Sequence, residues 1–229
     1  MRITVKIRRR VWLRFFIGLV TIAAIIAVAT VYFGGRTNPA APNAVATPTS
    51  SPAIEVPVAD DAAPTGCLGG PDRTATMVLA AQQAAPQTTN GAIEVAAAFT
   101  RWIQRFPYPA AQEAEAVSTA LLARDSFTND LTSYLDGSPD LSGGMVQGGT
   151  AYYMTTVPGD WKVESSSPDR DEVTVGSAFV VDGAHSPTLK SSITVVTVWE
   201  NGHWKISEAN GARTTQDLYA AGSPFAGGC

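Results

Sequence analysis

The two cysteines are the residues whose type and spacing carry the clearest chemistry in the sequence. Cys67 and Cys229 are its only cysteines. Outside the cytoplasm an even number of cysteines favours disulfide formation, and the ends of a domain often lie close together. We therefore predict an intramolecular bridge, with free thiols and an intermolecular bridge as alternatives. Two cysteines and two histidines make a structural zinc site unexpected, so no metal is predicted.

Catalytic motifs are missing from the sequence. It contains no G-x-S-x-G, GK[ST], H-E-x-x-H, C-x-x-C or G-x-G-x-x-G pattern. Residues 143–149 (GGMVQGG) are rich in glycine but lack the Lys-Ser/Thr pair of a phosphate-binding loop, which favours a flexible loop. His185 lies in a predicted loop, and His203 flanks a predicted tight turn across from Glu200. We predict no catalytic residues and no cofactor.

Aromatic side chains are better candidates for function, because Trp and Tyr are enriched where proteins contact one another. Those that stand out are Trp102, Phe106, Tyr108, Trp161, Trp199 and Trp204. We expect most of them to fill a hydrophobic core. Trp161, which follows Pro-Gly-Asp, and Tyr108 are the candidate interface residues.

Charge is distributed unevenly along the chain. The first 36 residues hold seven basic residues and no acidic ones, whereas the rest holds 9 basic and 20 acidic residues, a net charge of −11. An acidic domain repels polyphosphate, so nucleic acid is not an expected partner.

The N-terminal region predicts a membrane anchor. Residues 15–33 form an uncharged, mostly apolar run (FFIGLVTIAAIIAVATVYF). As a helix this run is about 28 Å long, close to the hydrocarbon thickness of a bilayer. The arginine-rich residues 1–14 favour the cytoplasmic side, which places the rest of the chain outside. A signal peptide cleaved after Ala27-Val28-Ala29 and a buried soluble helix are the alternatives.

Residues 34–66 are rich in Pro, Ala, Thr and Ser and contain few large apolar residues. Such a composition does not bury enough surface to fold, and predicts an extended linker. We interpret it as a passive spacer; a tether that crosses part of a cell wall is the alternative. The folded domain is predicted to occupy residues 67–229.

The first half of this domain is predicted to be helical. Helical patterns cover residues 73–85, 91–106, 111–124 and 127–135. The second pattern has an apolar face formed by Val95, Phe99, Trp102 and Phe106. Asp72 and Asn90 are the expected N-caps of the first two helices.

The second half is predicted to form strands, at residues 151–157, 161–165, 172–182, 191–200 and 203–208. Asn201-Gly202 is a preferred two-residue hairpin turn. It predicts that Glu200 lies opposite His203 and that Trp199 lies opposite Trp204. Helices followed by antiparallel strands indicate the α+β class.

The order of elements over 73–210, with its closing hairpin VVTVWENGHWKISE, resembles the NTF2-like cone fold. The hairpin contains the pattern Trp-x-x-Gly-x-Trp-Lys. A membrane anchor joined to such a domain is similar to VirB8/TcpC-type components of conjugative (type IV) secretion machines. It is also similar to the Mce-associated membrane proteins of actinobacteria. The resemblance implies N-terminal helices followed by a curved antiparallel sheet.

Two functions follow from this resemblance. The first is a scaffold subunit of an envelope assembly for conjugation or secretion, whose partners are the membrane, other envelope proteins and further copies of itself. The second is an exported small-ligand-binding protein or enzyme that uses the cone as a pocket, as ketosteroid isomerase does. The carboxylates and tyrosines available for such a pocket are Asp125, Asp130, Tyr134, Tyr152 and Tyr153.

Overall fold

The computed structural model describes residues 62–138, 140–211 and 213–229. The predicted tail (1–14), the membrane segment (15–33) and nearly all of the linker lie outside these residues. No helix within the described ranges is long and apolar enough to cross a bilayer. What the structure shows is the predicted domain at 67–229 and the short segment that leads into it.

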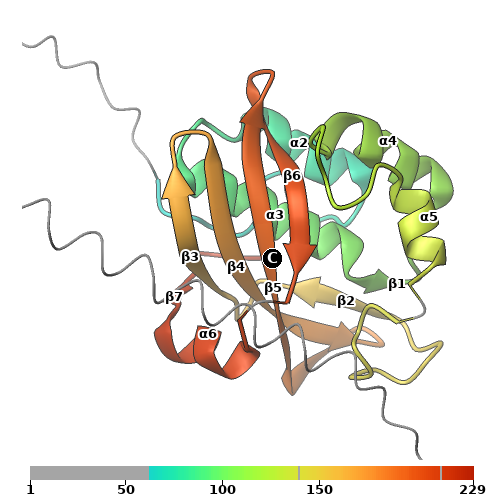
Figure 1. Cartoon of the computed structure of the whole chain (residues 1–229). Helices are drawn as coiled ribbons and strands as arrows, with labels where there is room; N and C mark the ends of the chain where they lie inside the picture. The colour runs from blue at the N-terminus through green and yellow to red at the C-terminus, as the bar shows by residue number, and fades with distance from the viewer. Residues whose placement is uncertain (1–61, 139, 212) are drawn as a thin grey trace, which may run out of the picture. The chain divides into compact units, whose positions relative to one another are not determined.

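Helices come first along the chain and strands follow, so the α+β class is confirmed (Figure 1). The first part contains α2 (Ala75–Ala84), α3 (Thr89–Ile103), the short strand β1 (Arg105–Phe106), α4 (Ala111–Leu121) and α5 (Leu131–Asp136). The second part contains β2 (Tyr152–Thr155), β3 (Asp160–Ser167), β4 (Arg170–Val181), β5 (Ala184–Glu200), β6 (His203–Asn210), α6 (Thr215–Ala221) and β7 (Ser223–Pro224).

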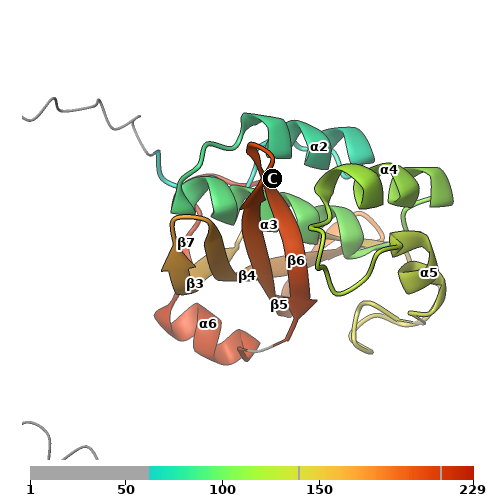
Figure 2. The same cartoon turned by 45° about the horizontal axis from the view of Figure 1, so that its top comes forward.

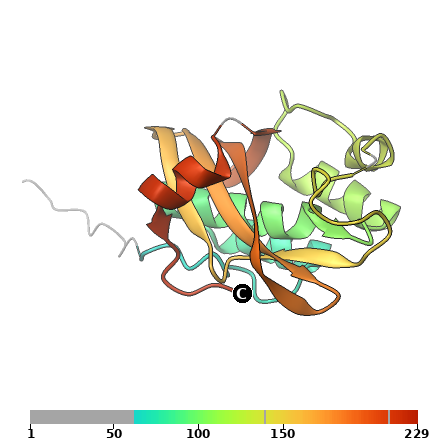
Figure 3. The ribbon, with the colours of Figure 1, turned by 90° about the horizontal axis from the view of Figure 1, so that it is seen from below.

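The strands form one antiparallel sheet centred on β4. Strands β2 and β3 pair with different halves of one edge of β4, and β5 and then β6 extend the sheet from the other edge. The sheet curves into a half-barrel, with α3 across one face (Figures 2 and 3). Such a curved sheet behind N-terminal helices is compatible with the cone that the sequence predicts.

Helix α3 forms the centre of the hydrophobic core. Its Phe99 and Trp102 are fully buried and belong to the same cluster as Val173, Val175 and Val195 of the sheet. The helical periodicity of the sequence therefore identified Val95, Phe99 and Trp102 as buried, although every residue of α3 from Gly91 to Ile103 is buried and the helix has no exposed face.

The ends of α3 differ from the prediction of 91–106. The helix begins at Thr89, and the hydroxyl of Thr88, not Asn90, accepts the capping hydrogen bond from the Gly91 amide. It ends at Ile103, and Phe106 lies in β1, paired with Tyr152. The residue before a proline is disfavoured in the helical region, so Pro107 holds Phe106 in extended backbone.

The predicted hairpin is confirmed. Trp199 pairs with Trp204 and Glu200 pairs with His203. The turn residue Asn201 has a φ of 54° and is followed by a glycine with a φ of 81°, as a type I′ turn requires. The two indole rings meet edge to face, with centroids 5.3 Å apart.

Other boundaries shift where tertiary contacts compete with helix formation. Helix α2 is capped by Thr74 rather than Asp72. The helix predicted to reach residue 124 ends at Leu121, because Leu122 forms a parallel bridge with Ile206 of β6 and the Ala123 amide donates to the Ile206 carbonyl. These contacts cover part of the outer edge of β6, which would otherwise be open to other strands.

Helix α6 was not predicted. It lies on the face of the sheet opposite α3. Its Leu218 packs over Gly176 of β4. Residue 176 faces the other side of the strand from Val173 and Val175, which belong to the core beside α3. A Cβ atom at Gly176 would lie 2.7 Å from Leu218 Cδ2. Close approach of the helix therefore depends on the absence of a side chain at this position.

Substituting Gly176→Ala should lower the free energy of unfolding by about 1–3 kcal/mol, because an added methyl group overpacks the contact with buried Leu218. Chemical denaturation followed by tryptophan fluorescence measures this effect. Gly211→Ala is the matched control, since a Cβ atom there meets no other atom within 4 Å. Equal stability of the two variants would contradict the proposed docking of α6.

Candidate functional site

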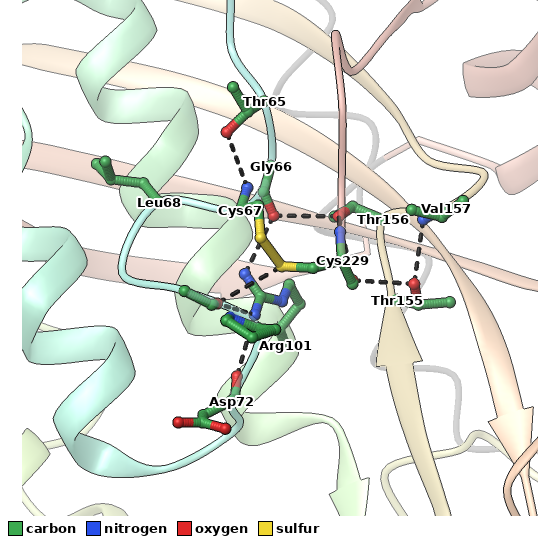
Figure 4. Close-up of a disulfide and its surroundings, with 12 residues drawn as sticks. Thr65, Gly66, Cys67, Leu68, Asp72, Arg101, Thr155, Thr156, Val157 and Cys229 are labelled. Carbon is green, nitrogen blue, oxygen red and sulfur yellow. Dashed lines mark hydrogen bonds between the residues drawn. A yellow bond between two sulfur atoms is a disulfide. The ribbon is translucent and has the colours of Figure 1, made fainter.

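The two ends of the domain meet at a disulfide between Cys67 and Cys229, whose Cα atoms are 5.5 Å apart (Figure 4). We call residues 62–72, which carry Cys67 past helix α3, the strap. The last residue, Cys229, lies beside the end of β2. The disulfide therefore joins the strap to the C-terminal segment next to α3.

The side-chain carboxylate of Glu94, on α3, binds backbone amides of the strap. Its Oε1 accepts hydrogen bonds from the Thr65 amide at 2.5 Å, the Thr65 hydroxyl at 2.8 Å and the Gly66 amide at 3.2 Å. Its Oε2 accepts from the Leu68 amide at 3.2 Å. Charge-assisted hydrogen bonds of this kind are stronger than bonds between neutral groups, so the carboxylate fixes the backbone of the strap.

Arg101, two turns further along α3, binds the carbonyl groups of the same strap. Its guanidinium donates to the carbonyls of Gly66 at 3.1 Å, Gly70 at 2.7 Å and Asp72 at 3.0 Å. The side chain is fully buried. Burial, together with the nearby charge of Arg73, lowers the pKa of Arg101 to about 10, so it stays protonated at neutral pH. Glu94, Arg101 and the disulfide together form what we call the strap clamp.

The C-terminal segment is held to β2 by further hydrogen bonds. The Cys229 carbonyl accepts from the Thr155 hydroxyl at 2.9 Å and from the Thr156 amide at 3.1 Å. The Thr156 hydroxyl lies 3.1 Å from the Gly66 carbonyl and 3.0 Å from the Cys229 amide. The strap, α3, β2 and the C-terminal segment are thus one connected unit.

Neither Glu94 nor Arg101 was predicted as a functional residue, although the sequence carries a signal for them. They are the only charged residues in the sequence of α3, and their spacing of seven residues places both on one face of the helix. Charged side chains are rarely buried unless they are paired or hydrogen-bonded. Two charges on an otherwise apolar helix therefore indicate specific polar partners.

A small pocket lies beside β1 and β2. The segment that connects α5 to β2 loops out near these strands (Figure 1). Its volume is about 100 Å³. It is lined by Phe106, Tyr108, Asp140, Val146, Tyr152 and residues 147–150. Three features that the sequence presented separately meet here: the candidate interface residue Tyr108, the candidate site residue Tyr152 and the glycine-rich segment.

The other carboxylates and tyrosines considered for a cone pocket have separate structural roles. Asp130 caps α5 by accepting from the Thr132 and Ser133 amides. Tyr134 packs edge to face on Phe127, with ring centroids 5.3 Å apart. The Arg73 guanidinium lies 4.4 Å from the centre of the Tyr153 ring.

Asp125 and the two histidines do not join a site either. Asp125 is exposed, and its carbonyl accepts a hydrogen bond from Ser207. His185 is exposed on β5, and His203 is half-buried in the hairpin opposite Glu200. In the described part of the chain, no group of three or more His, Cys, Asp or Glu side chains could hold a metal ion.

Trp161 lies in β3, paired with Val175 and Ser223. It is half-buried and packs against the main core, rather than standing exposed after its turn. Its role as an interface residue stays a prediction.

The structure therefore contains two features that geometry singles out, the strap clamp and the small pocket. Comparison of the chain with protein-family models, curated proteins and solved structures finds no match.

Proposed function

We propose that this protein is a membrane-anchored scaffold subunit of an assembly outside the cytoplasm. Residues 15–33 hold it in the membrane, and the linker at 34–66 leads to the folded domain. The observation that supports this proposal is the strap clamp, which lies where the linker enters the domain. Through Glu94 and Arg101, tension on the linker passes into the central helix α3. A tethered domain benefits from such an attachment, because a force on the linker does not separate the strap from α3.

The filled interior of the half-barrel supports a scaffold over an enzyme. Phe99, Trp102 and Trp204 are large side chains with at most 1% of their surface exposed, and they belong to the core cluster between α3 and the sheet. Drug-sized ligands usually need pockets of roughly 300–1,000 Å³. The pocket beside Tyr152, at about 100 Å³, is smaller than that range. Three more open pockets, of about 300, 330 and 270 Å³, lie beside Glu94, Ser166 and Arg213, near the lower limit of the range.

The curved sheet supports the cone fold alone, and the finer resemblance rests on the predicted anchor joined to such a domain. We propose on this basis that the assembly serves conjugative transfer or another transport process, as for VirB8/TcpC-type and Mce-associated proteins. Partners are other envelope proteins and further copies of the chain.

Crosslinking in the native membrane tests the proposal. A photo-crosslinking residue at exposed Met145 is expected to capture a discrete set of envelope proteins or a second copy of the chain. The control is the same anchor and linker joined to an unrelated folded domain that carries the crosslinker. If both proteins capture the same neighbours, the scaffold function is wrong.

Membrane topology gives a separate prediction. A reporter enzyme that is active only outside the cytoplasm, fused after residue 70, should be active, because the arginines of residues 1–14 hold the N-terminus inside. A fusion after residue 14 is the matched control and should be inactive. Activity confined to a cytoplasmic reporter after residue 70 would overturn the topology. The mass of the mature protein distinguishes a retained anchor from cleavage after Ala29.

A further inference from the structure

The pocket beside β1 and β2 contains a buried polar group that lacks a partner. Tyr152 has only 5% of its surface exposed, and its hydroxyl oxygen has no hydrogen-bond partner among the residues that the structure describes. Burial raises the pKa of Tyr152, so its phenol stays neutral. A buried hydroxyl without a partner costs about 1–3 kcal/mol, and a ligand that supplies a donor removes this cost.

Two further acceptors border the same space. The Tyr108 hydroxyl accepts a hydrogen bond from the Leu141 amide at 3.1 Å. The Asp140 carboxylate accepts from the Ser142 amide at 2.7 Å and from the Gly144 amide at 2.6 Å. Each carboxylate oxygen keeps a second lone pair after accepting one bond. Hydrogen bonds from Ser142 lower the pKa of Asp140, so the group remains ionised at neutral pH.

The charge of the residues that line the pocket determines whether a cation or an anion binds there. Asp140 is the only charged side chain among the lining residues, so an anion is repelled. Phe106, Tyr108 and Tyr152 add aromatic rings, whose faces attract cations. The pocket therefore combines a carboxylate, phenol oxygens and aromatic rings, which together favour a cation that also has apolar carbon atoms.

The size of the pocket limits the ligand further. At about 100 Å³ the pocket is smaller than the roughly 300–1,000 Å³ of sites for drug-sized ligands, so it suits the end of one side chain. A lysine ammonium with its last methylene groups, or an arginine guanidinium, fits this space. The acidic domain, with its net charge of −11 beyond residue 36, also attracts a basic partner.

We infer that this pocket receives the cationic end of a lysine or arginine side chain from a basic partner protein. This inference rests on the proposed scaffold function, because it specifies the partner's chemistry. Asp140 pairs with the cation, the Tyr152 hydroxyl accepts one of its hydrogen bonds, and the aromatic rings contact its methylene groups. The glycine-rich segment forms one wall, where Gly148 and Gly149 allow a ligand to approach the backbone because they lack side chains.

Small cations that mimic the two side chains test the pocket chemistry. The full chain in lipid nanodiscs is titrated with n-butylammonium and n-propylguanidinium while the NMR signals of the Gly148, Gly149 and Thr150 amides are followed. We expect saturable shifts of these signals with a Kd in the millimolar range. The neutral 1-pentanol and the anionic pentanoate should shift them at least tenfold less. If pentanol or pentanoate binds as tightly as the cations, the pocket is not a cation site.

Two variants separate the pocket chemistry from folding. Tyr152→Phe removes only a hydroxyl without a partner, so the domain should remain as stable as the parent while cation affinity falls about threefold to tenfold. Asp140→Asn should lower the affinity about twofold to fivefold, because Asp140 is exposed and exposed ion pairs are weak. Asp136→Asn removes an exposed carboxylate outside the pocket and is the control for net charge. Unchanged cation affinity in Tyr152→Phe and Asp140→Asn would overturn the inference.

Crosslinking from Met145 then distinguishes this inference from the scaffold proposal. Partners that are captured by the parent chain and lost in the Tyr152→Phe/Asp140→Asn double variant support the inference. Partners that persist in the double variant overturn it and leave the scaffold function intact. The absence of a specific partner for the parent chain overturns the scaffold function itself, and with it the partner assigned here.

Discussion

Opening the Cys67–Cys229 disulfide is expected to lower the free energy of unfolding by about 3–5 kcal/mol. The bridge joins residues 162 positions apart. In the chain-entropy model, closing a loop of this length removes about 5 kcal/mol of conformational freedom from the unfolded chain. Measured effects are often smaller than the model gives, which sets the lower end of the range.

Denaturant titration of the parent chain and of the Cys67→Ser/Cys229→Ser double variant measures this loss. Adding a reductant to the parent should reproduce the stability of the double variant, whereas the double variant itself should not respond to reductant. Ser50→Ala, in the linker outside the described domain, is the unaffected control. A double variant that equals the oxidised parent in stability would show that the bridge does not constrain the unfolded chain.

Replacing Arg101 with methionine is expected to lower the free energy of unfolding by about 3–5 kcal/mol. Methionine keeps much of the side-chain volume but donates no hydrogen bond. The buried Gly66 carbonyl then keeps only the Thr156 hydroxyl, the carbonyls of Gly70 and Asp72 lose this donor, and Glu94 loses a nearby opposite charge. Removing a buried charge that offsets another buried charge, together with its hydrogen bonds, is among the most destabilising effects of a single substitution.

Arg124→Met is the matched control, because Arg124 is exposed and its stability effect should remain within about 0.5 kcal/mol. Hydrogen exchange provides a second measurement: the amides of Thr65, Gly66 and Leu68 should exchange faster in Arg101→Met than those of the sheet. Equal stability of the two arginine variants would mean that the strap is not held by Arg101. Since Arg101 and the disulfide fix the same segment, their effects should not be additive.

The sequence alone predicted the elements whose signals are local. The apolar face of α3 follows from helical periodicity, because a helix places residues three and four apart on one side. The Trp199–Trp204 pair follows from Asn201-Gly202, because only such residues adopt the positive φ angles of the turn without strain. Each of these signals lies within a short stretch of chain, so no distant contact is needed to interpret it.

Tertiary structure decided the features that depend on distant residues. Leu122 lies outside α4 because it pairs with Ile206. Helix α6 packs on the sheet because Gly176 has no side chain. Glu94 and Arg101 acquire their role only when the strap, far away in the sequence, runs past α3.

The same division applies to the candidate sites. Two cysteines in a sequence with an apparent export segment suggested a bridge, but only folding brought Cys67 and Cys229 within 5.5 Å between Cα atoms. Tyr108, Tyr152 and the glycine-rich segment looked like separate features in the sequence. They line one pocket because β1 and β2 pair and the segment at 140–150 folds over them. Local patterns specify elements, whereas a site is made by side chains that only packing brings together.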